Sequence, residues 1–511
     1  MRVADEPNVD VLRQKAAILE AENERLVRDY TTALRAMLAL KGMSPEAIEL
    51  NLPGLVEQAK GRPSKLRAGA SERRPRDGSD EGEKQKRGHG PTEQLSLETK
   101  AETFDVDDAD KKCTACGGDL SAWDGADDVV EVVDRIPAQW IIRKCTLKKY
   151  RCKCGGCVVT ADGPEKLIVG GRYTLDVALQ SCIEKFVFHI PIERQARMAA
   201  DVGMKITSQT LWDQQWAVAK LFEKHVGKIR AFVLDRDVLG ADLTSFMHIK
   251  KGGGEYKQVW QVACPQARYF EMLDSKSAKA GEQVFATKDA DGKITRAFKG
   301  IAVVDGAAEL EALGRELGFT IANCWSHARR NVLKAESEAP GQVAQFLDLV
   351  ATLYEIEREA AGDDVDKPGG YRKRIDLDEL RRLRAERSRP ATEAIQKWIL
   401  GQSCIPGGKL KKALEYVASR WSALTRFLDD PRIPIDNNIT EAGFVGLAQG
   451  RRNYVGCRTD RGMTVATTFY TVFESARVAG ANPDAYLRYA ARAILNDGNA
   501  LLPHEWLAAT A

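Results

Sequence analysis

The sequence lacks the features that would assign it to a membrane, secreted or strongly charged class of protein. It contains no run of about 18 apolar residues, so it predicts no transmembrane helix. Residues 1–10 lack the basic, apolar and small segments of a secretory signal peptide, so we expect a cytoplasmic protein. Lys and Arg total 76 against 73 Asp and Glu, and the formal charge of +3 gives no general attraction to an anionic partner.

Cysteine is also scarce, and its distribution is uneven. Eleven Cys in 511 residues are too few for a disulfide scaffold, yet six of them fall within residues 113–157. In a reducing compartment such a cluster favours metal binding over cystine. At about 100–200 residues per domain the length predicts several domains, and 44% hydrophobic residues are enough to build their cores.

The N-terminal segment has the hydrophobic spacing of a coiled coil. Mostly apolar residues recur every seven positions in two registers from Leu12 to Leu40, and Asn23 occupies one of the predicted core positions. A buried Asn fixes register and strand number, so we expect a parallel homodimer or a higher oligomer. An amphipathic helix packed on its own chain is the alternative.

Residues 60–87 are predicted to form a flexible linker. They contain ten Lys or Arg and five Asp or Glu, without aromatic or β-branched residues. This local excess of positive charge suits contact with phosphates without sequence preference. A solvated spacer fits the same composition.

Two Cys-x-x-Cys motifs flank strand-like sequence in the next segment. We expect Cys113, Cys116, Cys154 and Cys157 to hold a structural Zn²⁺ ion, with Cys152 as the alternative to Cys154. Cys145 lies inside the strand-like residues 138–147 and is predicted to be a buried thiol. A closed four-Cys site leaves no open position, so we expect no zinc chemistry there. Free thiols are the alternative.

Residues 173–226 have a helical pattern with a break at Gly203. A predicted helix over residues 191–200 precedes this glycine, and Thr207 or Ser208 is a suitable N-cap for a second helix. Helix, glycine turn and capped helix is typical of a helix-turn-helix that binds DNA. An ordinary helical hairpin with its Trp residues in the core fits the periodicity equally well.

Short strand-like runs begin at Ala231, and two of them end in an acidic residue. The predicted strands cover residues 231–241, 257–264, 267–273 and 300–304. Asp242 follows the first and Asp305 follows the last, where polar groups line the ligand crevice of a mixed sheet. A third acid, Glu441, follows a polar run that can start a helix. Oxygen ligands from separate elements are what Mg²⁺ requires, although a lone Asp at a strand end often caps a turn.

Several ordered motifs make the sequence resemble the insertion sequence 66 family of DDE transposases over nearly the whole chain. Besides the coiled coil and the Cys cluster, they are Pro191-Ile-Glu-Arg-Gln195, Ala241-Asp-Leu-Thr244, Val304-Asp-Gly306, Cys324-Trp-Ser-His327-Ala-Arg-Arg330, Ile435-Asp-Asn-Asn438, Gly450-Arg-Arg-Asn-Tyr454 and Asn482-Pro-Asp-Ala-Tyr-Leu487. The resemblance implies a nucleoid-associated enzyme that binds the terminal inverted repeats of a mobile element, cleaves DNA 3′ ends and joins them to target DNA. Accessory transposition proteins are a further class of partner.

The resemblance also implies roles for individual residues. Asp242, Asp305 and Glu441 would hold two Mg²⁺ or Mn²⁺ ions in an RNase H-like core, with a helical insertion between the second and third acids. His327, Arg329 and Arg330 look like the family's second group of site residues, with the Arg side chains as phosphate clamps. Arg451, Arg452 and Tyr454 form a cluster suited to DNA backbone contact and base stacking. For both groups, a solvated surface is the alternative.

The sequence departs from the family pattern directly after Glu441. Ala442 stands where the family has Arg, and Val445-Gly446 stands where Arg-Pro is usual. The loss of these cations favours, as an alternative, a catalytically degenerate transposase-derived protein that binds DNA. A nuclease on an RNase H fold without strand transfer is a further alternative.

Together these observations predict a multidomain α/β protein. Its expected parts are a coiled-coil dimerisation helix (1–44), a flexible basic linker (45–105), a zinc-finger domain (106–165), a helical DNA-binding region (166–228), an RNase H-like core in two parts (229–335 and 431–478) around a helical insertion (336–430), and a C-terminal helical appendage (479–511).

Overall fold

The computed structural model describes residues 139–151, 158–250, 252–361 and 376–510, which belong to one compact unit of the chain. The predicted coiled coil and basic linker lie outside the described residues, as do the predicted zinc ligands Cys113, Cys116, Cys152, Cys154 and Cys157. These expectations stay predictions. None of the described helices is both long and apolar enough to cross a bilayer.

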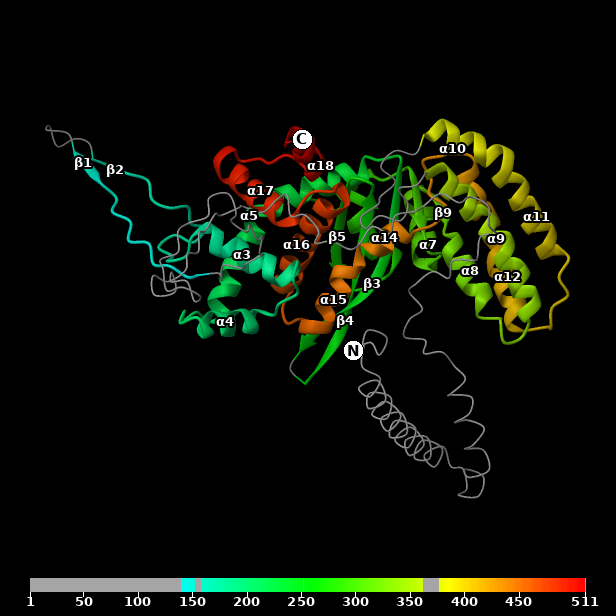
Figure 1. The fold of residues 1–511 in the computed structure, drawn as a ribbon, viewed down its shortest axis with the longest axis horizontal. Helices are drawn as coiled ribbons and strands as arrows, with labels where there is room; N and C mark the ends of the chain where they lie inside the picture. Colours follow the sequence, from blue (N-terminus) through cyan, green and yellow to red (C-terminus); the bar gives the residue numbers. More distant parts are fainter. Residues whose placement is uncertain (1–138, 152–157, 251, 362–375, 511) are drawn as a thin grey trace, which may run out of the picture. The chain divides into compact units, whose positions relative to one another are not determined.

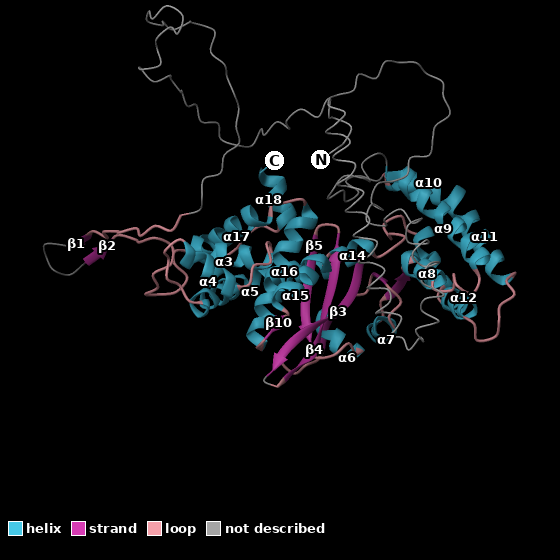
Figure 2. Ribbon diagram, turned by 60° about the horizontal axis from the view of Figure 1, so that its bottom comes forward, coloured by secondary structure: helices cyan, strands magenta, loops and turns pink. Residues whose placement is uncertain are grey.

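A mixed sheet forms the centre of this unit. Its strand order is β5-β4-β3-β8-β9, and the short β10 pairs with β3 beyond the end of β8. Strand β4 runs antiparallel to its two neighbours, whereas β8, β9 and β10 continue the direction of β3. The strands are β3 (Val238–Lys250), β4 (Gly253–Cys264), β5 (Ala267–Leu273), β8 (Ile301–Val304), β9 (Thr320–Asn323) and β10 (Gly456–Cys457). Figure 2 shows them in magenta among the helices.

Helices from both ends of the described chain cover one face of the sheet. They are α3 (Leu175–Phe186), α4 (Ile192–Asp201), α5 (Ser208–Leu234), α15 (Phe444–Tyr454), α16 (Asp460–Ala479), α17 (Pro483–Asp497) and α18 (Pro503–Thr510). Phe222 of α5, Phe469 of α16 and Tyr486 of α17 are fully buried in one core with Val259 and Phe270 of the sheet. Figure 1 shows this group around β5.

The opposite face of the sheet is covered by two short helices. They are α6 (Ala278–Phe285) and α7 (Ala308–Leu317), and α6 leads into the hairpin of β6 (Ala286–Lys288) and β7 (Ile294–Ala297). Trp260 and Val262 of β4 are buried there against Leu310 and Leu313 of α7. The second half of β4, from Val259 to Cys264, is therefore buried on both faces.

A third core lies beside β9 and is almost entirely helical. Its elements are α8 (Trp325–Leu333), α9 (Pro340–Ala361), α10 (Leu377–Leu383), the π-helix η5 (Arg384–Ser388), α11 (Arg389–Leu400), α12 (Lys409–Ser419), α13 (Trp421–Thr425) and the 3-10 helix η6 (Arg426–Leu428). Val303 and Ala322 of the sheet join this core, where Trp325 and Phe346 are fully buried. Figure 1 shows α9 to α12 grouped beside β9.

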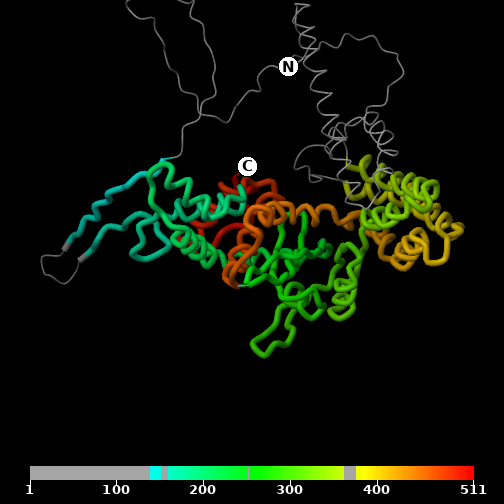
Figure 3. Tube along the Cα trace, turned by 90° about the horizontal axis from the view of Figure 1, so that it is seen from below, coloured from blue at the N-terminus to red at the C-terminus, as the bar shows by residue number. Residues whose placement is uncertain are grey.

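The chain then returns from this helical group to the middle of the sheet. Helix α14 (Asn438–Ala442) contacts β3 and β4, and α15 follows along β3. Figure 3 shows this orange segment lying against the green strands, which come from a distant part of the sequence.

Both outer edges of the sheet are covered by side chains that bond to the backbone. On β5, the Phe270 N–H donates to Thr471 Oγ1 at 3.1 Å. The Arg268 N–H donates to Ser475 Oγ at 2.9 Å, and Ser475 Oγ donates back to the Arg268 carbonyl at 2.8 Å. On β9, Arg426 Nε donates to the Ile321 carbonyl at 3.0 Å. At these positions, the backbone N–H and C=O groups that point away from the sheet are thus hydrogen-bonded.

The predicted helix, glycine break and capped helix are present as α4, Gly203 and α5. Gly203 has a φ of +84°, and the Thr207 hydroxyl accepts the Thr210 N–H at 3.1 Å. Helix α5 is 27 residues long, and its Trp212 and Trp216 side chains pack against the first core. The second helix is therefore built into the sheet domain along much of its length.

The strand predicted over residues 231–241 is wrong at both ends. Residues up to Leu234 belong to α5, and the strand begins at Val238 and continues past Asp242 to Lys250. The reason is that Phe222, Ile229 and Val233 continue one buried helical face, which outweighs the β-branched composition.

Two further expectations are corrected. Residues 139–148 form no strand in the described structure, and Cys145 is exposed rather than buried, because no partner strand pairs with this segment. The residues from Pro483 do not form a separate appendage. Tyr486 and Leu487 lie in the first core, and the Tyr486 hydroxyl lies 2.7 Å from His225 Nε2 on α5.

A buried ion pair joins the helical group to the segment that leads toward α14. Arg384 Nε donates to Glu357 Oε1 at 2.7 Å, and both side chains are almost fully buried. The same guanidinium donates to the carbonyl groups of Phe427, Asp430 and Ile433. Arg384 therefore fixes the chain just before it turns back to the sheet.

We expect Arg384→Met to lower the free energy of unfolding by about 3–5 kcal/mol, because it leaves the buried Glu357 carboxylate without this cation. The matched control is Arg387→Met, three residues later, whose partner Glu359 is exposed. That variant is expected to lose less than about 1 kcal/mol. Urea unfolding of the two variants measures the difference, and equal losses would contradict a structural role for the buried pair.

Candidate active site

Two of the predicted acids lie level with each other on neighbouring parallel strands. Gly240 of β3 pairs with Val303 of β8, and Asp242 and Asp305 each follow two residues later. Asp242 lies within β3 and Asp305 directly follows β8, and this register brings the two carboxylates close enough for their charges to interact. The sequence prediction that these acids meet is consistent with this register.

The backbone around Asp305 is held in a tight turn. Asp305 Oδ1 accepts the Ala307 N–H at 2.8 Å, and Gly306 has a φ of +93°. A Cβ atom on Gly306 would lie 2.5 Å from the Tyr416 hydroxyl, which donates to the Asp305 carbonyl at 2.9 Å. Only glycine fits this backbone conformation and this close approach.

The third acid, Glu441, reaches the same strand end through the packing of α14 on β3. A Cβ atom on Gly240 would lie 1.9 Å from Thr440 Oγ1, so the helix sits directly on the strand at this glycine. Asn437 Nδ2 donates to the Ala241 carbonyl at 3.0 Å. The residue before Glu441 and the N-cap of its helix are thus fixed beside Asp242.

The three carboxylates interact electrostatically. Burial raises the pKa of Asp242 to about 7, the negative charges of Asp305 and Glu441 add to the rise, and the Leu243 N–H bonded to Oδ1 opposes it. A buried carboxyl with such a pKa among like charges is a candidate for a functional group.

His327 and Arg330 of α8 face Glu441 from the other side. His327 Nδ1 lies 3.4 Å from Glu441 Oε1, and Arg330 Nη2 lies 3.8 Å from Glu441 Oε2. Arg330 Nη1 is also 3.1 Å from His327 Nε2. The structure therefore brings these two predicted residues to the acids, whereas Arg329 is exposed.

The second predicted cluster divides into residues with different surroundings. Arg451 donates to Thr244 Oγ1 at 3.2 Å and to the Ser245 carbonyl, so it joins α15 to β3 just beyond Asp242. Arg452 is exposed. Tyr454 is not placed for base stacking, because its ring packs against the first core and its hydroxyl bonds to that of Tyr470.

Two side chains of the site escaped the sequence analysis. Gln261 lies directly opposite Asp242 on β4 and is 1% exposed, and within the described structure its amide has no hydrogen-bond partner. Cys324 precedes α8, and its buried Sγ accepts the Asn437 N–H at 3.2 Å. A polar residue inside the apolar run of β4 was an available signal for the first. The Cys-x-x-His spacing from Cys324 to His327 was an available signal for Cys324.

The donor set fits a hard divalent cation. Asp242, Asp305 and Glu441 offer carboxylate oxygens from three separate elements, which is the chemistry that Mg²⁺ selects. Burial, and then the charges of Asp305 and Glu441, raise the pKa of Asp242, and a bound cation would stabilise its ionised form.

A sequence model of the transposase IS66 family matches residues 170–465 of the chain. This range covers all three acids, α8 and the central sheet, and it ends within α16. The chain belongs to the IS66 transposase family.

Two curated relatives come from Sinorhizobium fredii (strain NBRC 101917 / NGR234), and both are named as uncharacterized proteins. The protein y4jD is 25% identical over 428 residues, which is 79% of this chain and 80% of y4jD. The protein y4hP is 23% identical over 426 residues, which is 78% of this chain and 74% of y4hP.

The pKa of Asp242 gives this IS66-family chain a predicted dependence of stability on pH. The pKa rises from 3.8 to about 7 on folding, so the native state binds this proton more tightly. The contribution of Asp242 to the free energy of unfolding is therefore greatest below about pH 4 and falls until about pH 7. We expect Asp242→Asn to remove this fall and to be more stable than wild type at pH 8 by about 2–4 kcal/mol.

Urea unfolding from pH 4 to pH 8 in metal-free buffer measures this effect. Asp213→Asn, on the exposed surface of α5, serves as the control and should follow the wild-type profile. An Asp242→Asn profile parallel to that of wild type would contradict the crowding of charge at this site.

Proposed function

We propose that this chain is a metal-dependent DNA transposase. It binds the terminal inverted repeats of a mobile element, cleaves DNA 3′ ends and joins them to target DNA. The observation that carries the proposal is the convergence of Asp242, Asp305 and Glu441, which raises the pKa of Asp242 by mutual charge as well as by burial.

The topology of the sheet supports an RNase H-like core. Strand β3 is central, β4 and β5 follow as antiparallel neighbours, and β8 and β9 extend the sheet in parallel on the other side of β3. Asp242 lies on the central strand and Asp305 follows its parallel neighbour. This is where a catalytic pair from adjacent strands would have to lie.

Asp242, Asp305 and Glu441 would hold two Mg²⁺ or Mn²⁺ ions, which when bound activate water or a DNA 3′-hydroxyl and neutralise the leaving oxygen. The protein side chains orient these ligands. Asp242 bonds to the Leu243 N–H and Asp305 to the Ala307 N–H, so one oxygen of each carboxylate is fixed by the backbone. Both carboxylates are thereby pre-organised for a ligand.

Neighbouring cations support substrate binding despite Ala442. Arg330 lies 3.8 Å from Glu441 and is half exposed, so its guanidinium can reach a phosphate beside the acids. Arg451 lies along β3 beyond Asp242. These two residues come from elements other than α14, and they supply positive charge beside Glu441 and along β3. This observation favours an active enzyme over a degenerate relative.

We expect Asp242→Asn, Asp305→Asn and Glu441→Gln each to slow Mg²⁺-dependent cleavage of terminal-repeat DNA by about a hundredfold or more. A bound metal contributes several kcal/mol to the stabilisation of the transition state, and each variant removes one of its ligands. Asp348→Asn on the exposed surface of α9 is the matched control and should cleave at the wild-type rate. Gel assays that resolve nicked and joined products measure both steps.

A wild-type rate in any one of the three variants would contradict the assignment of that residue. Specific DNA binding without cleavage by the wild-type protein would instead support the degenerate DNA-binding alternative. Cleavage without joined products would support a nuclease that lacks strand transfer.

The two Arg residues of α15 should affect DNA binding in different ways. Arg452 is exposed, so Arg452→Ala should weaken DNA binding equally for all sequences and lower the slope of log affinity against log salt concentration by about 0.9. Arg451 bonds to β3, so Arg451→Ala should also lower the stability of the protein. Fluorescence anisotropy at several salt concentrations and urea unfolding measure the two effects. An unchanged salt slope for Arg452→Ala would show that it contacts no phosphate.

A further inference from the structure

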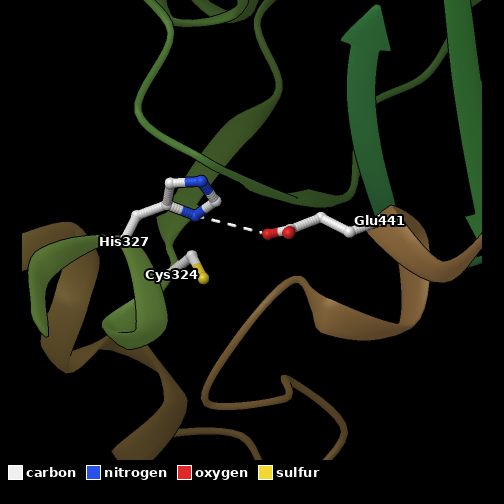
Figure 4. Close-up of side chains that lie close together, drawn as sticks. All are labelled: Cys324, His327 and Glu441. Carbon is white, nitrogen blue, oxygen red and sulfur yellow. Dashed lines mark ion pairs between the residues drawn. The ribbon is translucent and has the colours of Figure 1, made fainter. Parts of the chain in front are cut away.

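Cys324, His327 and Glu441 form a second cluster of possible metal ligands beside the three carboxylates. Their Sγ, ring nitrogen and carboxylate oxygen all lie within 4.8 Å of one another. Figure 4 shows the His327 ring and the Glu441 carboxylate pointing toward each other, with the Cys324 sulfur beside them. Glu441 therefore faces two different sets of neighbours.

The facing atoms of His327 and Glu441 are buried without hydrogen bonds. Within the described structure, His327 Nδ1 and Glu441 Oε1 have no hydrogen-bond partner, although they lie 3.4 Å apart. A buried polar atom that lacks a partner costs about 1–3 kcal/mol. Two such atoms that face each other need an explanation, and a shared ion would satisfy both.

The distance between these atoms agrees with tetrahedral coordination. Two ligands that each lie about 2.0–2.1 Å from one Zn²⁺ ion at the tetrahedral angle are about 3.3–3.4 Å apart. The Cys324 sulfur lies within 4.8 Å of both of these atoms. Water would fill the fourth position.

The ligand types select a different ion from the one expected at the three carboxylates. A thiolate, an imidazole and a carboxylate suit a borderline-soft ion, whereas Mg²⁺ requires oxygen ligands. We propose that Cys324, His327 and Glu441 bind a Zn²⁺-like ion at a second site, which shares Glu441 with the three-carboxylate site. Binding displaces the proton of the Cys324 thiol into solvent.

The backbone around the second site is fixed independently of any ion. Cys324 and His327 are three residues apart at the start of α8, so they lie on one side of that helix. The Trp325 N–H donates to the Ile435 carbonyl at 3.1 Å, and the Asn437 N–H donates to Cys324 Sγ. These bonds hold the start of α8 against the chain that leads to Glu441.

Sharing Glu441 couples the two sites. An ion bound to Cys324 and His327 uses Glu441 Oε1, and its positive charge opposes the binding of further cations at Asp242 and Asp305. If the proposed function holds, Zn²⁺ at the second site inhibits the Mg²⁺-dependent reaction. The binding itself does not depend on that function.

Cobalt binding to the full-length protein tests the site without DNA. Co²⁺ replaces Zn²⁺ in such sites, and a Cys ligand gives thiolate-to-metal absorption in the near ultraviolet. Cys324→Ser keeps a hydroxyl to accept the Asn437 N–H, and Cys264→Ser removes another buried thiol as the matched control. The difference between wild type and Cys324→Ser cancels any cobalt bound by the cysteines of residues 113–157.

We expect Cys324→Ser to lose the absorption of about one thiolate-bound Co²⁺ and Cys264→Ser to keep it. His327→Gln should weaken this binding by about tenfold or more. Identical cobalt spectra for wild type and Cys324→Ser would overturn the proposal.

A cleavage assay with terminal-repeat DNA and Mg²⁺, with and without added Zn²⁺, tests the consequence. We expect Zn²⁺ to inhibit wild type and Cys264→Ser, and to have at least about tenfold less effect on Cys324→Ser relative to its own zinc-free rate. Equal inhibition of the two Cys variants would overturn the shared site. A wild-type protein that is inactive with Mg²⁺ alone would count against the proposed function, while the cobalt result would still decide the second site.

Discussion

Crowding of negative charge at one end of β3 and β8 is the constraint on which the rest of the structure depends. Burial and two neighbouring carboxylates raise the pKa of Asp242 to about 7, so the fold must hold these groups together against repulsion. It does so through backbone contacts. Thr440 packs on Gly240, and Arg268 of β5 donates to the Ile439 carbonyl at 2.8 Å. Helix α14 is therefore held against the sheet at the two residues directly before Glu441.

The helical group beside β9 has a direct part in this arrangement. Arg384 bonds to three carbonyl groups of the segment that leads toward α14, and Tyr416 of α12 bonds to the Asp305 carbonyl. The helices between the second and third acids thus support the backbone of both. A change in the packing of these helices would shift the backbone beside the acids, because each of these bonds holds a backbone carbonyl group in a fixed position.

The end of β8 could be predicted from the sequence because Asp305 follows a run of apolar residues. The predicted strand end at Asp242 was wrong, because β3 continues to Lys250, although its register beside β8 does place Asp242 level with Asp305. The end of α5 was misread, because Val233 is β-branched but lies on a buried helical face. The orientation of Tyr454 and the nearness of Cys324 to Glu441 depend on the packing of α14 and α15 on β3. Such contacts between distant segments have no local sequence pattern.

The hydroxyl groups of Thr471 and Ser475 have a consequence for assembly. They occupy the outward N–H and C=O groups of β5, while Arg426 occupies a carbonyl of β9. A strand from another molecule could add to either side only after α16 or the Arg426 side chain moved away. These contacts therefore oppose the joining of two central sheets through β5 or through this part of β9.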